Sequence, residues 1–285
     1  MPVGGYAGLA GVAVLIGDAN EMSGFLVINP RSGDAEPSAV ELRDEARRRG
    51  IETHLLEQND DPSEVARRAP DGAVGMAGGD GSLAAVAQVA IELDVPFVAV
   101  PFGTRNHFAR DIGLDRDDPL AALAAFEGNE RRIDVGRVNE RPFLNNVSLG
   151  LYARLVHRRE GHRRRRNAFA RLRAFGLFLQ HPGSLGVTVD GQPAHARIVL
   201  VANNGYKLEP LSIGERDRVD EGKLYLYVAH GWLPGSWEEQ RGETFTVDAR
   251  AGRLHAAIDG EPEELETPLG FEIEPAALRV LLPPG

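Results

Sequence analysis

The chain of 285 residues has a net charge of −10, and we therefore expect that the protein as a whole does not bind nucleic acid. It contains no cysteine, which excludes disulfides, thiolate metal sites and cysteine nucleophiles and is compatible with a reducing cytoplasm. Because this length exceeds that of most single domains, we expect two domains.

Residues 1–23 are interpreted as an extension of the folded part. Their most apolar run, residues 7–17, is shorter than the roughly 20 residues that span a bilayer, and no basic segment precedes it. We therefore expect neither a transmembrane helix nor a signal peptide, and we expect a cytoplasmic protein with a loosely packed extension.

Residues 24–128 alternate apolar strand-like runs with helix-like segments. The expected strands are 25–28, 51–56, 73–76 and 96–100, and the expected helices are 37–49, 83–93, 120–126 and one that begins near residue 61. Asp61, Pro62 and Glu64 have the chemistry of a capped helix start. This alternation predicts an α/β nucleotide-binding domain with a parallel sheet and right-handed crossovers, which ends near Gly128.

Two of these strands lead into glycine turns. The first turn is Gly78-Gly79-Asp80-Gly81-Ser82, and the second contains Gly103, Thr104 and Asn106. Glycine lets the backbone approach an anion closely, and a helix N-terminus offers free N–H groups and a positive dipole. Because ligands of parallel sheets bind at the carboxyl ends of strands, we expect both turns to face one phosphate site. Taken alone, either turn can equally be a tight connection.

The residues after the first strand offer a third candidate loop. Asn29, Ser32 and Gly33 supply an amide, a hydroxyl and a flexible N–H near the expected phosphate site, although a plain Asn-Pro turn explains them as well. The lysines of the chain are Lys207 and Lys223, and neither lies in a Walker-type P-loop pattern. Any nucleotide must then be held by backbone N–H groups, hydroxyls, arginine and a metal ion.

The pattern changes to short strands after Gly128. The segments 133–138 and 143–148 suggest a hairpin, and short alternating runs recur at 185–189, 195–202, 223–229, 243–248, 253–258, 271–274 and 278–282. Many short strands in succession predict a second domain, residues 129–285, that is a β-rich antiparallel sandwich.

A basic segment at residues 157–180 interrupts this β pattern. Arginines recur from Arg158 to Arg173, and large apolar side chains such as Phe169 and Phe175 lie between and after them. Read as a helix, residues 168–179 have an apolar stripe beside a basic edge, which suits an anionic membrane surface. The alternative is a solvated basic face that pairs with the many carboxylates of the chain.

Four segments resemble, in order, the motifs of one family, the diacylglycerol kinase catalytic-domain family. Asn29-Pro30-Arg31-Ser32-Gly33 resembles its opening loop, and Gly78-Gly79-Asp80-Gly81-Ser82 resembles its Gly-Gly-Asp-Gly-Thr signature. The segment 101–110 resembles its second loop, and Asp259-Gly260-Glu261 resembles its late Asp-Gly-Glu motif. The resemblance implies an NAD-kinase-like nucleotide domain covered by a β-rich domain, with the active site between them, and an ATP- and Mg²⁺-dependent lipid kinase.

The resemblance also implies roles for individual residues. Glu261 would deprotonate the acceptor hydroxyl, Asp259 would orient it or share a cation, and Asp80 would hold the Mg²⁺ that bridges the nucleotide phosphates. The implied nucleotide-binding residues are Asn29, Ser32, Gly33, Gly78, Gly79, Gly81, Ser82, Gly103, Thr104 and Asn106. Without the resemblance, Asp80 reads as the stabiliser of a turn and the Asp-Gly-Glu segment as an ordinary hairpin turn.

Two positions depart from the family pattern, and one further loop resembles a metal site. Ser82 replaces a threonine and keeps the hydroxyl, whereas His107 replaces the aspartate of many members and brings no fixed negative charge. The loop at Asp220 and Glu221 resembles one that binds a structural divalent cation in some bacterial members. A plain acidic turn is the alternative for that loop.

The sequence therefore predicts a cytoplasmic lipid kinase that associates peripherally with anionic membranes, uses ATP and Mg²⁺, and phosphorylates a hydroxyl of diacylglycerol or a similar lipid. One rival is an NAD-kinase-like enzyme that phosphorylates a soluble hydroxyl compound. A second rival is a non-catalytic module that binds nucleotide or lipid. The oligomeric state is open, and a homodimer is compatible with the sequence.

Overall fold

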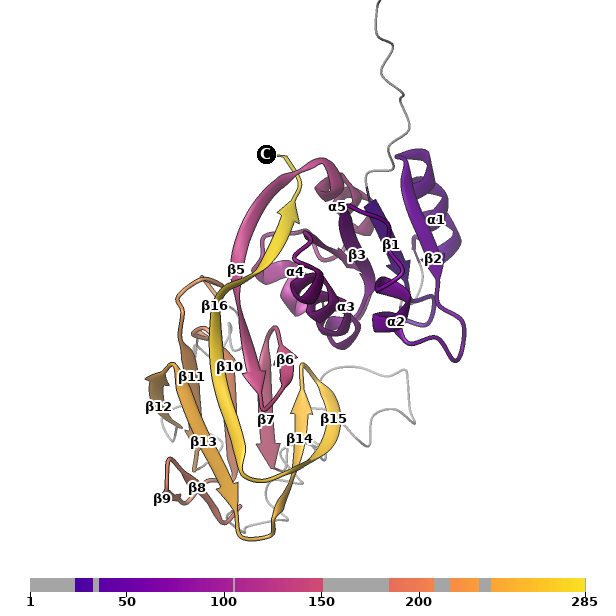
Figure 1. Cartoon of the computed structure of the whole chain (residues 1–285). Coiled ribbons are helices and arrows are strands. Elements are labelled where there is room, and N and C mark those ends of the chain that lie inside the picture. Colours follow the sequence, from indigo (N-terminus) through magenta and orange to yellow (C-terminus); the bar gives the residue numbers. More distant parts are fainter. Residues whose placement is uncertain are drawn as a thin grey trace, which may run out of the picture.

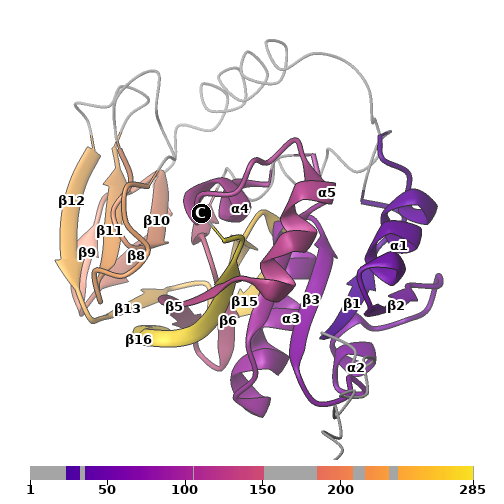
Figure 2. The same cartoon turned by 90° about the horizontal axis from the view of Figure 1, so that it is seen from above.

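A computed structural model describes residues 24–32, 36–104, 106–150, 185–207, 216–230 and 237–284. The expected extension 1–23, the basic segment 157–180 and the candidate nucleotide residue Gly33 lie outside the described residues. Within the described part the strands form two sheets, and Figures 1 and 2 show β10, β11 and β12 at the end of the molecule opposite α1 and β2.

The amino-terminal half is built on parallel strands in the spatial order β2-β1-β3-β4. Apolar side chains cover both faces of this sheet because helices pack on both. The strands are β1 (Gly24–Ile28), β2 (Ile51–Leu55), β3 (Ala73–Gly78) and β4 (Phe97–Pro101). One face carries α1 (Ala39–Arg48), α5 (Pro119–Ala122) and the 3₁₀ helix η1 (Leu123–Glu127), and the other carries α2 (Pro62–Ala66), α3 (Asp80–Leu93) and α4 (His107–Asp111).

The helix starts follow from capping chemistry. The predicted cap at Asp61 is confirmed, since its carboxylate accepts a hydrogen bond from the Ser63 N–H at 2.8 Å. Helix α3 begins at Asp80, earlier than the predicted start at residue 83, because Gly79 is its N-cap. The first glycine turn is therefore also the first turn of this helix, and its N–H groups are those that a helix leaves without intrahelical partners.

The carboxyl-terminal half is an antiparallel sandwich, as predicted. The six-stranded sheet has the order β12-β11-β10-β7-β14-β15, and β5, β6, β8, β9, β13 and β16 extend the large sheet. Apolar side chains from both sheets form one core. The strands are β5 (Asn129–Val138), β6 (Arg141–Phe143), β7 (Asn146–Gly150), β8 (Val187–Val189), β9 (Gln192–Ala194), β10 (Ile198–Asn203), β11 (Leu224–Ala229), β12 (Trp237–Gly242), β13 (Thr244–Ala249), β14 (Arg253–Ile258), β15 (Glu261–Glu266) and β16 (Leu269–Leu282).

The predicted strand 143–148 is wrong as a single element. Strand β6 ends at Phe143 and pairs with β5, whereas β7 begins at Asn146 and pairs with β10 and β14 in the other sheet. The break falls where the N–H groups of Leu144 and Asn145 donate to the carboxylate of Asp259 instead of to a neighbouring strand. The alternating pattern also missed the short strands β9, β12 and β15.

Strand β16 belongs to both halves of the molecule (Figure 1). Its first part pairs with β13 and β5, and a bulge lies between Glu274 and Leu278, where Ala276 donates its N–H to the Asp134 carboxylate at 2.9 Å. Beyond the bulge, Val280 pairs in parallel with Phe97 of β4 and is buried in the core that α3 also lines. The end of β16, which belongs to the predicted second domain, is thus a strand in the sheet of the predicted first domain.

Candidate functional site

The two glycine turns meet at the carboxyl ends of β3 and β4. A Cβ atom placed on Gly103 would lie only 2.6 Å from the Cα atom of Gly79, so no larger residue fits at position 103 without a shift of the backbone. A Cβ atom on Gly79 would meet no atom within 4 Å. The turns therefore contact each other directly, and the backbone at Gly79 borders open space.

Asn106 shapes the second turn. Its side chain accepts a hydrogen bond from the Gly103 N–H at 2.8 Å and donates to the carbonyl oxygens of Gly103 and Arg116 at 3.1 and 2.9 Å. The residue is buried, and its φ of 49° is the left-handed conformation that asparagine tolerates. The Asn106 amide thus stabilises the loop through these contacts, whereas the family resemblance implied that it binds the nucleotide.

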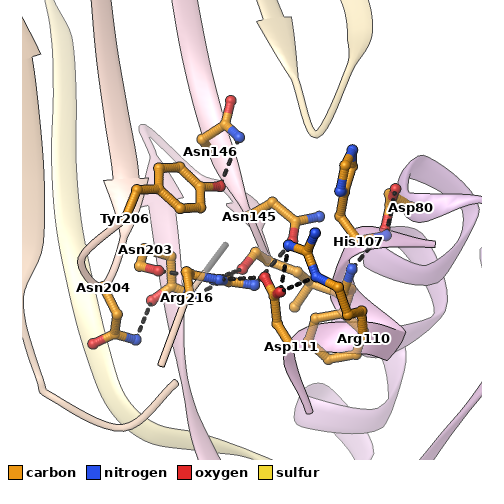
Figure 3. A network of polar contacts seen from close by, with 12 residues as sticks. Asp80, His107, Arg110, Asp111, Asn145, Asn146, Asn203, Asn204, Tyr206 and Arg216 are labelled. Carbon is orange, nitrogen blue, oxygen red and sulfur yellow. Dashed lines mark hydrogen bonds and ion pairs between the residues drawn. The ribbon is translucent and has the colours of Figure 1, made fainter. Parts of the chain in front are cut away.

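The Asp80 carboxylate connects the first glycine turn to the helix after the second (Figure 3). It accepts hydrogen bonds from the backbone N–H groups of His107 at 3.3 Å and Phe108 at 3.0 Å, which are the first residues of α4. A carboxylate at a helix N-terminus is stabilised by the unpaired N–H groups and the helix dipole. Asp80 thus has a structural role in addition to any role toward a ligand.

The Asp-Gly-Glu segment forms a tight hairpin turn between β14 and β15. Ile258 pairs with Glu261, and both central residues have positive φ, 47° at Asp259 and 88° at Gly260, as in a type I′ turn. The turn brings Glu261 against the first glycine turn, because a Cβ atom on Gly81 would lie 2.5 Å from the Glu261 Cγ atom. Glu261 is nonetheless an exposed residue, so this contact lies at the surface of the protein.

Asp259 anchors this turn. Its carboxylate accepts hydrogen bonds from the N–H groups of Leu144 and Asn145, both at 2.7 Å, and of Asn146 at 3.0 Å. Burial raises the pKa of Asp259 to about 6, the three N–H donors oppose this shift, and the negative charge of Asp80 adds to it. The carboxylates of the glycine turn and the hairpin turn are therefore near enough to interact.

The raised pKa of Asp259 predicts that both the reaction rate and the stability of the protein depend on pH. Below about pH 6 its carboxylate is protonated and no longer accepts all three N–H bonds that fix the turn, so the rate of any reaction that uses Glu261 should fall as the pH drops through about 6. Because the folded pKa lies above the unfolded value of 3.8, this group favours the folded state at low pH and loses that contribution as pH rises through about 6. Initial rates between pH 5 and 8 test the first effect, and thermal unfolding of the wild type and of Asp259→Asn tests the second.

A turnover that stays constant from pH 5 to 8 would contradict this role of Asp259. The control is the difference in stability between the wild type and Asp259→Asn, which isolates the contribution of Asp259 and should fall as the pH rises toward 6. Asp259→Asn removes the titrating group, and its stability should therefore lack the component that the wild type loses as pH rises through about 6.

A buried polar network behind the turns was not predicted (Figure 3). Arg216 donates to Asp111, Asn145 and two backbone carbonyl oxygens, and Asn146 donates to the Tyr206 hydroxyl at 2.8 Å. Burial raises the pKa of Tyr206 to about 12, so its hydroxyl stays neutral. The available signal was the pair Asn145-Asn146 between apolar strand residues, since buried amides need partners.

The first loop lies at the same edge of the sheet as the glycine turns. The Asn29 N–H donates to the Ala77 carbonyl at 2.9 Å, beside Gly78. The side chain of Asn29 accepts from the Arg31 N–H at 3.0 Å, and the Ser32 N–H donates to the Asn29 carbonyl at 3.1 Å. The structure thus places Asn29 and Ser32 near the turns, with the Asn29 side chain engaged in a local turn.

The remaining predicted residues of the turns differ in their surroundings. Gly78 packs tightly, since a Cβ atom there would lie 2.8 Å from the Met76 Cε atom. Ser82 is half-buried in the first turn of α3, and Thr104 is exposed. Ser82 and Thr104 are therefore the more exposed residues of these three.

The candidate metal residue Glu221 lies in the loop before β11, apart from the contacts of the glycine turns. Its carboxylate accepts from the Tyr225 hydroxyl at 2.7 Å, and its N–H donates to the Asn204 side chain at 2.9 Å. Ion pairs with Arg131 and Arg218 hold the pKa of the neighbouring Asp220 below its ordinary value. Within the described ranges no group of three or more His, Cys, Asp or Glu side chains is placed to hold a metal ion, so this site stays a prediction.

Residues 23–138 match the family model of the diacylglycerol kinase catalytic domain. The catalytic-domain match that the motifs predicted is therefore found in the amino-terminal half of the chain. The match to this kinase family includes both glycine turns but ends before Asp259 and Glu261, so only the fold brings these two residues to the turns.

Curated relatives support the same family. A protein of Cronobacter sakazakii named "Probable lipid kinase YegS-like" is 35% identical over 136 residues, which are 44% of this chain and 45% of that protein. One of Pseudomonas aeruginosa with the same name is 29% identical over 231 residues, 73% of this chain and 76% of that protein. The match thus spans about half the length of the Cronobacter relative and three quarters of the Pseudomonas relative.

A solved structure has the same fold. The crystal structure of a diacylglycerol kinase from Bacillus anthracis has a TM-score of 0.65 with 16% sequence identity, and the similarity covers 90% of this chain and 96% of that chain. At this identity the comparison concerns the fold, and it supports the arrangement of an α/β half and a β-sandwich half.

Proposed function

We propose that this protein transfers the γ-phosphoryl group of ATP to the hydroxyl of a lipid. The observation that carries the proposal is the contact of Glu261 with Gly81, which places the side chain of an exposed glutamate against the N-terminus of α3. This is where the two glycine turns meet and where a phosphate can approach the backbone most closely. The match to the kinase family model supports kinase chemistry at this site.

The glycine turns supply the phosphate site. The N–H groups at the start of α3 have no intrahelical partners, and the helix dipole adds positive potential at the same point. A Cβ atom on Gly79 would point into open space, so a ligand has room to approach the backbone there. Such preorganised donors stabilise the charge that spreads over the transferred phosphoryl group.

Glu261 would accept the proton of the lipid hydroxyl. As the hydroxyl oxygen forms its bond to the γ-phosphorus, the bond from that phosphorus to the bridging oxygen of ATP breaks and ADP leaves. The hydroxyl proton passes to the Glu261 carboxylate, which returns it to solvent. Asp259 does not take part in this transfer; its three hydrogen bonds hold the turn that carries Glu261.

Asp80 is the residue that fits a magnesium ion. Its two oxygens each accept one N–H bond and keep lone pairs, whereas the oxygens of Asp259 together accept three. Mg²⁺ is often held by one or two carboxylates together with substrate phosphates, so a single aspartate beside a phosphate site is a sufficient protein contribution. When bound, Mg²⁺ supplies positive charge to the nucleotide phosphates. His107 in place of aspartate leaves Asp80 and the nucleotide as the main ligands.

A lipid acceptor is favoured over a soluble one by two observations. The curated relatives carry the name of lipid kinases, and the segment 157–180 combines arginines with apolar side chains. We infer that this segment meets an anionic membrane surface while the hydroxyl enters the site. Among the residues that the structure describes, no helix is both long enough and apolar enough to cross a bilayer.

The direct test is an assay with γ-labelled ATP, Mg²⁺ and a lipid extract, followed by identification of the labelled product. The proposal expects a phosphorylated lipid, and omission of Mg²⁺ should abolish the product. Label in a soluble compound from a cytosolic extract would favour the NAD-kinase-like alternative. ATP binding without any transferred label would favour a non-catalytic module.

The membrane contact has its own expected result. Replacement of Arg163, Arg164, Arg165 and Arg166 by serine should weaken binding to vesicles that contain phosphatidylserine, by roughly 1 kcal/mol for each lost contact. The loss should shrink as the salt concentration rises. Vesicle sedimentation measures the binding, with neutral phosphatidylcholine vesicles as reference.

A matched control removes the same charge elsewhere. Serine at the exposed positions Arg48, Arg68, Arg250 and Arg253 should leave vesicle binding nearly unchanged. Equal binding of the wild type to neutral and anionic vesicles would support the solvated-face interpretation of residues 157–180 instead.

A further inference from the structure

Arg216 is the most extensively bonded buried cation that the described residues include, and the family motifs do not contain it. Its Nε donates to Asp111 Oδ2 at 2.7 Å, and its Nη2 donates to Asn145 Oδ1 at 2.9 Å. Its Nη1 donates to the carbonyl oxygens of Leu144 and Asn203, both at 2.8 Å. The side chains of Arg216 and Asp111 are 0% and 1% exposed.

These partners come from both halves of the molecule (Figure 3). Asp111 is the last residue of α4, Leu144 and Asn145 connect β6 to β7, and Asn203 ends β10. A single guanidinium group thus joins the helix after the second glycine turn to two segments of the sandwich. A buried charge is stable where it is paired and hydrogen-bonded, and Arg216 has an ion pair with Asp111 and donates four hydrogen bonds in all.

The connection between β6 and β7 is held from two sides. Arg216 binds its carbonyl and side-chain oxygens at Leu144 and Asn145, whereas Asp259 accepts the N–H groups of residues 144–146. A cation on the carbonyl side and an anion on the N–H side both match the dipole of the peptide groups between them. The position of Asp259, and with it the turn of Glu261, therefore depends on where Arg216 holds this connection.

Through its ion pair with Asp111, Arg216 is also connected to Asp80, because both aspartates bind helix α4 or belong to it. Helix α4 ends at Asp111, which Arg216 binds, and begins at His107 and Phe108, whose N–H groups bind Asp80. We propose that Arg216 is a positioning residue that sets the placement of the Glu261 turn relative to Asp80 and the glycine turns. This inference rests on the proposed phosphoryl transfer, and it adds a residue that touches neither reacting group.

Arginine is suited to this task and lysine is not. The planar guanidinium group directs several donors outward in fixed directions, so it can bind four oxygens of separate segments at once. A lysine keeps the charge but offers three donors at one nitrogen. Arg216→Lys therefore tests the geometry of the contacts while it keeps a cation beside Asp111.

The experiment combines hydrogen exchange with kinetics on the full chain. In Arg216→Lys we expect the amides of residues 144–146 to exchange about tenfold faster, while the amides of the distant helix α1 exchange as in the wild type. We expect kcat to fall by about 10- to 100-fold with little change in the KM for ATP, since a small misplacement of reacting groups can cost about 10²-fold. Should Arg216→Lys not fold, Asp111→Asn removes the same ion pair and is measured in the same way.

The control is Arg279→Met, which removes an ion pair with Glu130 away from these turns and should change neither readout. The inference fails if exchange at residues 144–146 and kcat both remain at wild-type values in Arg216→Lys. It also fails if exchange accelerates equally in α1, because that result indicates a general loss of stability. If the wild type shows no phosphoryl transfer, the proposed function fails separately, and the exchange data alone decide whether Arg216 holds the connection.

Discussion

Glu261→Gln is expected to lower kcat by about 10²–10⁴-fold, the usual contribution of a positioned base, while the affinity for ATP changes little. Glutamine keeps the size and hydrogen bonding of the side chain but cannot take the proton of the acceptor hydroxyl. The structure makes this variant informative, because Glu261 lies at the surface against Gly81 and no core packing is lost. The fold and the phosphate site should therefore survive the change.

Steady-state rates with γ-labelled ATP and a lipid substrate measure the effect, and calorimetry measures ATP binding. Glu264→Gln is the matched control, since it makes the same chemical change at another exposed position of β15. Near-normal turnover in the Glu261→Gln variant would remove Glu261 from the reaction and leave its motif as a plain hairpin turn.

Gly79→Val is expected to weaken ATP binding by about 100-fold or more, which corresponds to roughly 2.7 kcal/mol. The backbone at Gly79, with φ −82° and ψ 172°, suits a branched residue, and a Cβ atom there meets no atom of the protein within 4 Å. The fold should accept the valine, whereas its side chain would occupy the open space through which a phosphate reaches the N–H groups of α3.

Calorimetry with ATP and a thermal unfolding curve decide this prediction together. Unchanged ATP affinity in a stable Gly79→Val protein would show that the first glycine turn does not bind the nucleotide. Gly81→Ala gives a useful contrast, because its methyl group would collide with the Glu261 side chain. That variant should retain ATP binding and lose turnover.

The local parts of the site could be predicted because each is encoded in a few adjacent residues. A glycine turn between an apolar strand and a helix reads directly from the sequence at Gly78–Ser82, and the order of the motifs indicated the family. The parallel order of the strands then requires the turns after β3 and β4 to lie at one edge. The contact between Gly79 and Gly103 follows from that arrangement.

The long-range parts of the site could not be predicted in the same way. No local pattern indicates that the strand predicted at 143–148 stops after Phe143 because Asp259, far away in the sequence, takes the N–H groups of the next residues. Nor does the segment around Arg216 differ from a polar loop until the fold encloses it. The role of Asn106 in stabilising its loop could not be predicted either, because it depends on hydrogen bonds that only the folded structure reveals.

Strand β16 has a consequence for how the protein is made. Until residues 278–282 leave the ribosome, β4 lacks its neighbour in the sheet, and the start of β5 lacks the partner with which it pairs. The amino-terminal half can therefore collapse early but keeps an unprotected sheet edge, which is prone to pairing with other chains. The sheet of the amino-terminal half is thus completed only after the carboxyl-terminal half has been synthesised, so folding depends on contacts between distant residues and is expected to be slow.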